Sequence, residues 1–229
     1  MNNILTNGCE LTTAITNIFI AISSLICFLK LKSKKKTNLN VKLWLIFFFF
    51  ILIDGILGVI IHGIVMKQTT IDFLWYILSF FFSLTINTLL AITLYEYNNK
   101  GTFKSKVIFI LLTSILLYLV FFIESLCNID FLLTFIIYAA ICLGAICIIY
   151  IKQLKKDKHI KYYIYGLLLQ VIGGIFLLND KFKIHFIISL DKNGIYHLFM
   201  VGTIIMYYIG IINNNKLESK WFFFYDKKY

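Results

Sequence analysis

Seven stretches of the chain are almost entirely apolar, and each is about as long as a membrane crossing requires. A helix needs about 20 apolar residues to cross the hydrocarbon layer, within a range of about 17–25. The apolar residues form continuous runs and not the alternation of a β-barrel strand. The runs cover about 11–29, 41–66, 71–94, 107–123, 131–151, 160–178 and 195–212. They predict an all-α, polytopic membrane protein: a seven-transmembrane helix bundle over residues 1–212 and a short basic, aromatic tail over 213–229.

The composition excludes the main alternatives to this class. Hydrophobic residues make up 60% of the 229 residues and charged residues only 14%, whereas a soluble domain has roughly 45–50% and about 25%. A soluble chain of this size could not bury so much apolar surface, and a disordered chain would not contain it. The sequence also has no proline and no visible repeat, linker or second domain.

The lysines predict how the bundle is oriented. All 22 basic residues are lysine, and eighteen of them fall in the tail or in and directly beside the loops after the first, third and fifth runs. The loops on the other side contain only four. Cytoplasmic loops are the ones enriched in basic residues, so we expect the N-terminus outside and the C-terminus in the cytoplasm. Residues 1–9 contain no lysine, which argues against a cleaved signal peptide. The expected location is the plasma membrane if the protein is bacterial.

The net charge of +11 changes the expected partner less than its size suggests. In a soluble protein it would indicate nucleic acid, but arginine, which supplies forked contacts to bases, is absent. The lysine positions instead indicate the cytoplasmic membrane surface, so the predicted partner is membrane lipid and not nucleic acid. The oligomeric state is left open. Cys9 and Cys127 would lie near the same membrane face. Whether they form a disulfide or remain two thiols is also left open.

Ionisable and polar side chains inside the apolar runs are the first candidates for function, because such groups are costly in lipid and tend to face the bundle interior. In the second run Asp54 and His62 are eight residues apart and therefore share one helix face. Asp54 should lie deep and needs a partner or a proton. The third run contains a polar strip, Ser79, Ser83, Thr85, Asn87 and Thr88, and the sixth run contains Gln170. The strip is equally consistent with contacts between helices.

A second group of candidates lies near the predicted outer face. His62 is close to the outer end of the second run and His197 close to the start of the seventh. The same face should hold Glu10, Asp72 and His185. Each has an ordinary alternative: a histidine at the membrane interface bonds a carbonyl or water, and an acid at a helix end is solvated.

Short motifs give the chain a family resemblance. The first run begins Glu10-Leu11-Thr12-Thr13, the second contains His62-Gly63, and the seventh opens Asn193-Gly194-Ile195-Tyr196-His197. In number and order of spans the chain resembles the seven-span membrane hydrolase superfamily of alkaline ceramidases and progestin/adiponectin receptors, and most closely an uncharacterised bacterial branch. The resemblance implies a zinc ion held by one histidine of the second span and two of the seventh, whose bound water attacks a lipid amide or ester.

Only part of that ligand set is present. His62 and His197 match, but Asn193 stands where the superfamily has its third histidine, and Gly58 stands where it has a serine. The third ligand could be His185 or Asp191, or Asn193 as an oxygen donor. An acid, Asp72 or Glu10, would move the proton. The resemblance thus implies a zinc-dependent hydrolase acting on a lipid at the outer face.

Two other functions compete with this one. A transporter could use Asp54, Asn87 and Gln170 along a path, but the chain has no proline to break helices, no repeat and only one deep acid. A non-catalytic structural or receptor-like protein could keep the fold without the metal, because a catalytic zinc usually needs three protein ligands. We favour the hydrolase.

The predicted orientation is tested by labelling single cysteines in intact cells. In a background without the native cysteines, Asn3→Cys should react with a membrane-impermeant maleimide and Ser219→Cys should not. The opposite pattern would reverse the orientation and place the histidines on the cytoplasmic face.

Overall fold

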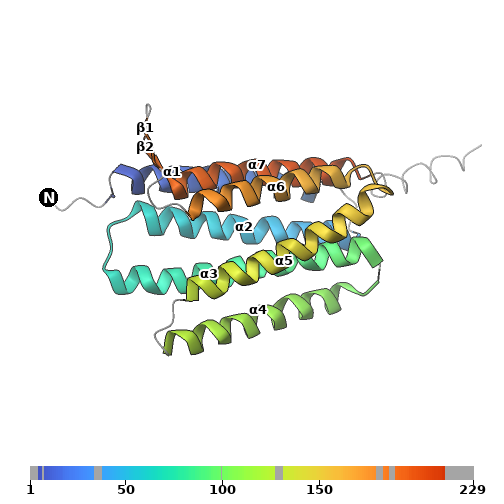
Figure 1. Cartoon of the computed structure of the whole chain (residues 1–229), viewed down its shortest axis with the longest axis horizontal. Helices are drawn as coiled ribbons and strands as arrows, with labels where there is room; N and C mark the ends of the chain where they lie inside the picture. The colour runs from blue at the N-terminus through green and yellow to red at the C-terminus, as the bar shows by residue number, and fades with distance from the viewer. Residues whose placement is uncertain are drawn as a thin grey trace, which may run out of the picture.

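A computed structural model describes residues 5–6, 8–33, 38–98, 100–126, 131–178, 183–185 and 189–214. In this part of the chain seven helices lie side by side (Figure 1). They are α1 (Gly8–Ser33), α2 (Leu39–Gly63), α3 (Gln68–Asn98), α4 (Phe103–Leu126), α5 (Phe131–Leu154), α6 (Ile160–Leu177) and α7 (Lys192–Ile212). Each is long and apolar enough to span a membrane. The prediction of seven helices is confirmed, and the fold fits an integral multi-pass membrane protein. The predicted tail lies outside the described residues apart from Asn213 and Asn214.

The helix ends differ from the predicted runs in an informative way. Most helices extend beyond their apolar run, because the polar residues that flank it continue the backbone hydrogen bonds without needing lipid around them. α2 instead stops three residues early, at Gly63. Ile64 is extended (φ −117°, ψ 133°) and forms an antiparallel bridge with Leu5. Thr6 also donates its backbone N–H to the Gly63 carbonyl at 3.1 Å. The start of the chain therefore pairs with the end of α2.

The order of packing places α1 between α2 and α7. α1 contacts both α2 and α7, α6 packs on α7, and α3 packs on α2. α4 and α5 contact the rest of the bundle chiefly through α3, with α5 also on α6. Two short antiparallel strands, β1 (Lys183–His185) and β2 (Ser189–Asp191), join α6 to α7. They lie at the end where α1 and α7 begin and α2 ends (Figure 1), which we call the histidine end; the other end is the lysine end.

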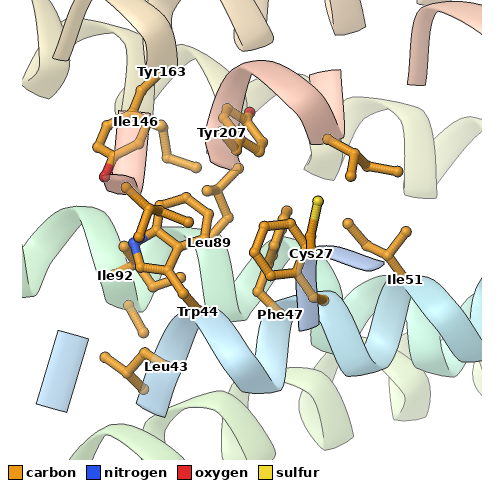
Figure 2. Packing of buried hydrophobic residues seen from close by; sticks show 14 of the residues in the cluster. Cys27, Leu43, Trp44, Phe47, Ile51, Leu89, Ile92, Ile146, Tyr163 and Tyr207 are labelled. Carbon is orange, nitrogen blue, oxygen red and sulfur yellow. The ribbon is translucent and has the colours of Figure 1, made fainter. Parts of the chain in front are cut away.

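Buried aromatic side chains of α2, α6 and α7 pack together in the interior of the bundle (Figure 2). Trp44 is fully buried, with its ring centre 5.3 Å from that of Tyr163 and 5.6 Å from that of Tyr207. Two glycines make room for the tyrosines. A Cβ added to Gly210 would lie 2.3 Å from the Tyr163 ring, and one added to Gly166 would lie 2.6 Å from the Tyr207 ring. The α6–α7 contact thus depends on a reciprocal pairing of tyrosine with glycine.

α1 has its polar side inward and its apolar side outward. Water-soluble helices have the reverse pattern. Its buried polar residues are Thr13, Thr16, Asn17 and Ser24, and its exposed large apolar residues are Ile15, Ile18, Phe19, Ile22, Leu25, Ile26 and Leu29. A helix with this distribution suits lipid outside and polar contacts between helices inside.

α1 and α2 approach closely because α2 has glycines along the contact. A Cβ on Gly55 would lie 2.9 Å from the backbone nitrogen of Ala21. One on Gly58 would lie 2.4 Å from the side-chain oxygen of Asn17. Close backbone approach through small residues is the usual basis of helix packing where no water drives association.

This contact predicts an unusual cost for a glycine-to-alanine change. Alanine is normally favoured over glycine inside a helix by about 1 kcal/mol, but at Gly55 its methyl would meet the α1 backbone, which cannot move aside without shifting the helix. We expect Gly55→Ala to lower the unfolding temperature measured in detergent. Gly144→Ala in α5 is the matched control, because a Cβ there has no neighbour within 4 Å. It should be neutral or stabilising, and an equal loss in both variants would contradict the prediction.

Candidate functional site

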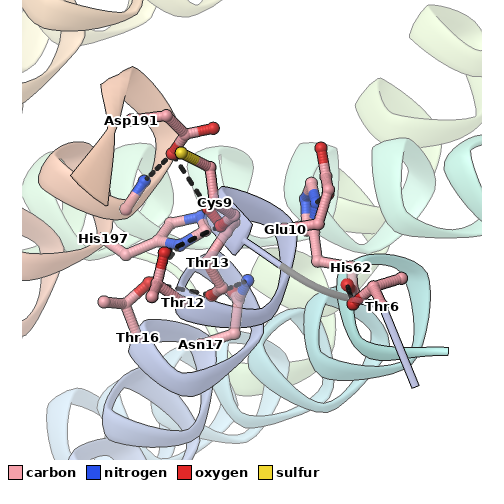
Figure 3. A network of polar contacts seen from close by, with 11 residues as sticks. Thr6, Cys9, Glu10, Thr12, Thr13, Thr16, Asn17, His62, Asp191 and His197 are labelled. Atoms are coloured by element: carbon pink, nitrogen blue, oxygen red, sulfur yellow. Dashed lines mark hydrogen bonds and ion pairs between the residues drawn. The ribbon is translucent and has the colours of Figure 1, made fainter. Parts of the chain in front are cut away.

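The structure brings together the two histidines that the sequence singled out. His62 lies in the last turn of α2 and His197 in the second turn of α7. Their ring centres are 6.3 Å apart, with the ring planes at 65°. α1 contacts both helices, and its side chains bond to both rings (Figure 3). The pair lies at the histidine end, 135 positions apart in the chain.

Glu10 fixes the tautomer of His62. Its Oε2 atom lies 2.7 Å from Nδ1 of His62. A carboxylate only accepts hydrogen bonds, so Nδ1 is the protonated nitrogen and a neutral ring keeps its lone pair on Nε2. The histidine side chain is 10% exposed, whereas that of Glu10 is 55% exposed. The edge of the Trp75 ring also contacts the imidazole, with centres 5.7 Å apart. Glu10 thus joins a buried imidazole to the solvent-accessible surface.

Thr16 fixes the tautomer of His197 in the same sense. Its Oγ1 atom donates its only proton to the Thr13 carbonyl at 2.8 Å. Oγ1 also lies 3.0 Å from Nδ1 of His197, and there it can only accept. Nδ1 of His197 is therefore a donor too, and Nε2 again has the lone pair. Both histidines are held by Nδ1 through α1 side chains, which leaves two basic Nε2 atoms.

A carboxylate sets the start of α7 relative to α1. Asp191 is the N-cap residue of α7, and its Oδ1 accepts from the backbone N–H of Gly194 at 2.9 Å. The same oxygen accepts from the Thr13 hydroxyl at 2.9 Å. One atom therefore defines both where the helix begins and how far it lies from α1 (Figure 3). His197 lies three residues beyond Gly194, so its position depends on these two hydrogen bonds to Asp191.

This arrangement has the features of a partial metal site. Metal-binding histidines usually donate the other ring N–H to a carboxylate or a second oxygen, which orients the ring. Zinc–nitrogen bonds of about 2.0–2.1 Å place the ring centres of a tetrahedral pair about 5 Å apart, so the observed 6.3 Å must close by about 1 Å. Among the described residues no group of three or more His, Cys, Asp or Glu side chains could hold a metal. Two histidines alone do not complete a zinc site, which usually needs three protein ligands, so a third donor would have to come from elsewhere.

The other predicted site residues separate into near and distant ones. Asp72 is exposed and accepts from Gln68 of its own helix at 2.8 Å, so of the two predicted acids it is Glu10 that contacts a histidine. Asn193 is half-buried in the first turn of α7. His185 ends β1, opposite Ser189, and its side chain lies outside the described part of the structure, as does Cys127.

The predicted polar residues of the helix interiors bond mainly within the bundle. Asp54 accepts from the Thr85 hydroxyl of α3 at 2.9 Å, so the deep acid of α2 faces another helix, as predicted. Ser79 and Ser83 donate to carbonyls of their own helix, those of Trp75 and Phe80, at 2.8 and 2.7 Å. Gln170 is half-buried in α6. Both serine hydroxyls thus form their hydrogen bonds within α3 and not with the histidines.

Two interhelical polar clusters were not predicted. In the first, the Asn87 amide donates to Ser114 at 2.8 Å and accepts from Tyr138, which joins α3, α4 and α5. In the second, at the lysine end, Glu96 accepts from the Asn40 amide at 2.9 Å and lies 3.4 Å from the Tyr163 hydroxyl.

Only weak signals in the sequence could have found these clusters. Asn87 belongs to the polar strip already noted, but its partners, a single serine and a single tyrosine inside apolar runs, are common in any span. Glu96 lies two residues beyond the predicted end of the third run at 94, where an acid is expected to be solvated. α3 continues to Asn98 and keeps this carboxylate against α2 and α6.

Comparison with known proteins adds a family and no activity. The model of the DUF6962 family, which is described as a family of unknown function, matches residues 12–216. The chain belongs to the DUF6962 family. No curated protein and no solved structure matches it. The DUF6962 match covers α2 to α7 and α1 from Thr12 onward, so it includes His62 and His197 but not Glu10.

The double role of Asp191 predicts a larger cost than an ordinary cap. Loss of an N-cap side chain costs about 1 kcal/mol, and the bond to Thr13 adds about 1 kcal/mol more. Asp191→Ala should therefore lower the unfolding temperature more than Asn38→Ala, which removes only the cap of α2. Thr13→Val should account for the difference. Equal losses for the two cap variants in a thermal unfolding measurement would show that the tie to α1 contributes nothing.

Proposed function

We propose that this protein crosses the membrane seven times, with the histidine end outside and the lysine end in the cytoplasm. Three features support the proposal: the seven long apolar helices, the outward apolar face of α1, and the concentration of eighteen lysines in the loops and tail of one side. Basic residues concentrate on the cytoplasmic side of membrane proteins.

We further propose that the His62–His197 pair is the centre of a zinc-dependent hydrolase that acts on a lipid amide or ester at the outer face. The observation that carries this proposal is that a side chain of α1 lies within hydrogen-bond distance of Nδ1 in each ring. Each Nδ1 is held as a donor by a side chain of α1, so each Nε2 offers a lone pair at the same end of the bundle. The short-motif resemblance to the seven-span hydrolase superfamily points to the same two residues.

In this proposal each neighbouring side chain has a distinct task. A bound zinc ion would polarise the scissile carbonyl and activate a water molecule. Glu10 keeps the proton of His62 on Nδ1 and, being half-exposed, can exchange protons with the outside solution. Thr16 does the same positioning for His197. The third ligand is left open among Asn193, in the first turn of α7, His185, at the end of β1, and Asp191, whose Oδ1 already accepts from Gly194 and Thr13.

The competing function is a non-catalytic membrane protein that keeps the fold without the metal. Two observations favour it: Asn193 stands where the resembled superfamily has its third histidine, and no cluster of three metal-binding side chains occurs among the described residues. In that case the bond between Glu10 and His62 would serve only to join α1 to α2.

Metal content separates the two functions. Protein purified in detergent without chelators should contain about one zinc ion per chain by mass spectrometry of the metals, and should hydrolyse a fluorogenic lipid amide. His62→Ala and His197→Ala should each reduce the bound zinc at least tenfold, because a site with two protein ligands left is open and weak. Both variants should stay folded, since the helices are held by interhelical packing.

The matched control is His159→Ala. His159 is as buried as His62, since each whole residue is 8% exposed. It lies at the N-terminus of α6 beside Tyr163, at the lysine end. It should retain the zinc content of the unmodified protein. A zinc content near zero in the unmodified protein, or an equal loss in His159→Ala, would reject the hydrolase and favour the non-catalytic function.

A further inference from the structure

Two apolar grooves run side by side on the outer surface of α2, toward the lysine end. The first lies between α2 and α4, has a volume of about 250 Å³, and is lined by Ile46, Phe49, Phe50, Val107, Ile110 and Leu111. The second lies between α1 and α2, has a volume of about 230 Å³, and is lined by Phe28, Lys32, Leu45, Ile46 and Phe49. Ile46 and Phe49 line both, so together they form a ridge between the grooves.

Each groove has a lysine at its end. Lys32 lines the second groove and lies over the ring of Phe28, with Nζ 5.9 Å from the ring centre. Lys42 precedes Ile46 by four residues and therefore lies on the same face of α2, one turn nearer the lysine end. Its Nζ is 5.6 Å from the ring centre of Phe103, one turn before Val107 of the first groove. The two ammonium groups thus flank the ridge on the side of the basic loops.

The carboxylate that α3 has at this end of the bundle has partners in the interior. Glu96 is the carboxylate of α3 at this end, and it accepts from Asn40 and lies within reach of the Tyr163 hydroxyl. These partners belong to α2 and α6, whereas Lys32 and Lys42 lie at the grooves. The rims of the grooves are therefore positively charged, and their walls are apolar.

We propose that this surface is a binding site for one anionic diacyl phospholipid of the cytoplasmic leaflet. The phosphate group lies between Lys32 and Lys42, and the two acyl chains lie in the two grooves, on either side of the Ile46–Phe49 ridge. Lysines at helix ends extend toward the membrane interface, where they meet lipid phosphates. The proposal rests on the proposed insertion with the lysine end inside, and it is independent of the metal site at the other end.

The charge and the shape of the surface each select a feature of the ligand. A single apolar groove would suit any acyl chain, but two grooves with a shared wall suit a lipid with two chains. Two lysines favour a headgroup with net negative charge over a zwitterionic one, since each lysine near an anionic lipid surface contributes roughly a fivefold gain in affinity.

Native mass spectrometry of the detergent-solubilised protein tests the proposal. With dioleoyl phosphatidylglycerol and dioleoyl phosphatidylcholine added in equal amounts, we expect one phosphatidylglycerol to be retained, with a preference on the order of tenfold. The double variant Lys32→Ala, Lys42→Ala should reduce this preference to about twofold or less. Lysophosphatidylglycerol, which has one chain, should be retained less than the two-chain lipid.

The control is Lys161→Ala. Lys161 lies over the ring of Tyr162 at 5.0 Å, in the first turn of α6, and lines neither groove. It should keep the full preference, and circular dichroism should show the same helix content in all variants. Equal retention of the two headgroups, an equal loss in Lys161→Ala, or equal retention of the one-chain lipid would overturn the proposal. His62→Ala should leave the lipid preference unchanged, so failure of the metal site does not affect this test.

Discussion

The close contact between α1 and α2 is the constraint on which the histidine end depends. Gly55 and Gly58 let the α1 backbone approach α2, and that approach brings Glu10 within 2.7 Å of His62. α1 also has Thr13 and Thr16 on the side that faces α7. α1 is therefore the element that relates the two histidines to each other, although neither histidine belongs to it.

In the proposed lipid surroundings, polar contacts between helices have a different weight from those of a soluble protein. Lipid is as apolar as the side chains that face it, so burial of apolar area does not drive the helices together. Van der Waals packing and interhelical hydrogen bonds hold the helices together instead. Each such hydrogen bond contributes on average about 0.6 kcal/mol and rarely more than about 1.7 kcal/mol. The bonds of Thr85 to Asp54 and of Thr13 to Asp191 are of this kind. Individually small, they select which helix faces meet.

The sequence predicted the features that follow from the surroundings of each helix, such as its length and its inward polar residues. It did not predict the hydrogen bonds between one helix and another. Long apolar runs separated by lysine loops were enough to predict seven helices, because the cost of polar groups in lipid acts on each segment separately. The inward direction of Asp54 followed from the same rule, as did the shared end of His62 and His197. Bonds between segments, such as Asn87 with Tyr138 or Asn40 with Glu96, depend on helix rotation, which apolar runs do not specify.

The candidate site shows the same division. Glu10 was one of two acids at the correct end, and its distance along the chain from His62 gave no reason to choose it over Asp72. The choice is made by helix rotation: Asp72 faces Gln68 at the surface of α3, whereas Glu10 faces α2. Thr16 was not singled out, because a threonine inside an apolar run is a common residue and its role appears only when α7 is beside α1.

The bond between Asn87 and Ser114 has a consequence for bilayers of different thickness. Ser114 is one of few buried residues of α4, near the middle of the helix, whereas residues such as Leu112, Leu116 and Ile123 are exposed. A helix whose apolar length does not match the hydrocarbon layer adjusts by tilting. Because α4 is held at its midpoint by a polar bond and packs mainly on one neighbour, it can tilt about Ser114. α1 and α2, which contact each other along a glycine-lined seam, and α7, which packs on α1, would keep their angles, and the two histidines would keep their separation as the membrane thins or thickens.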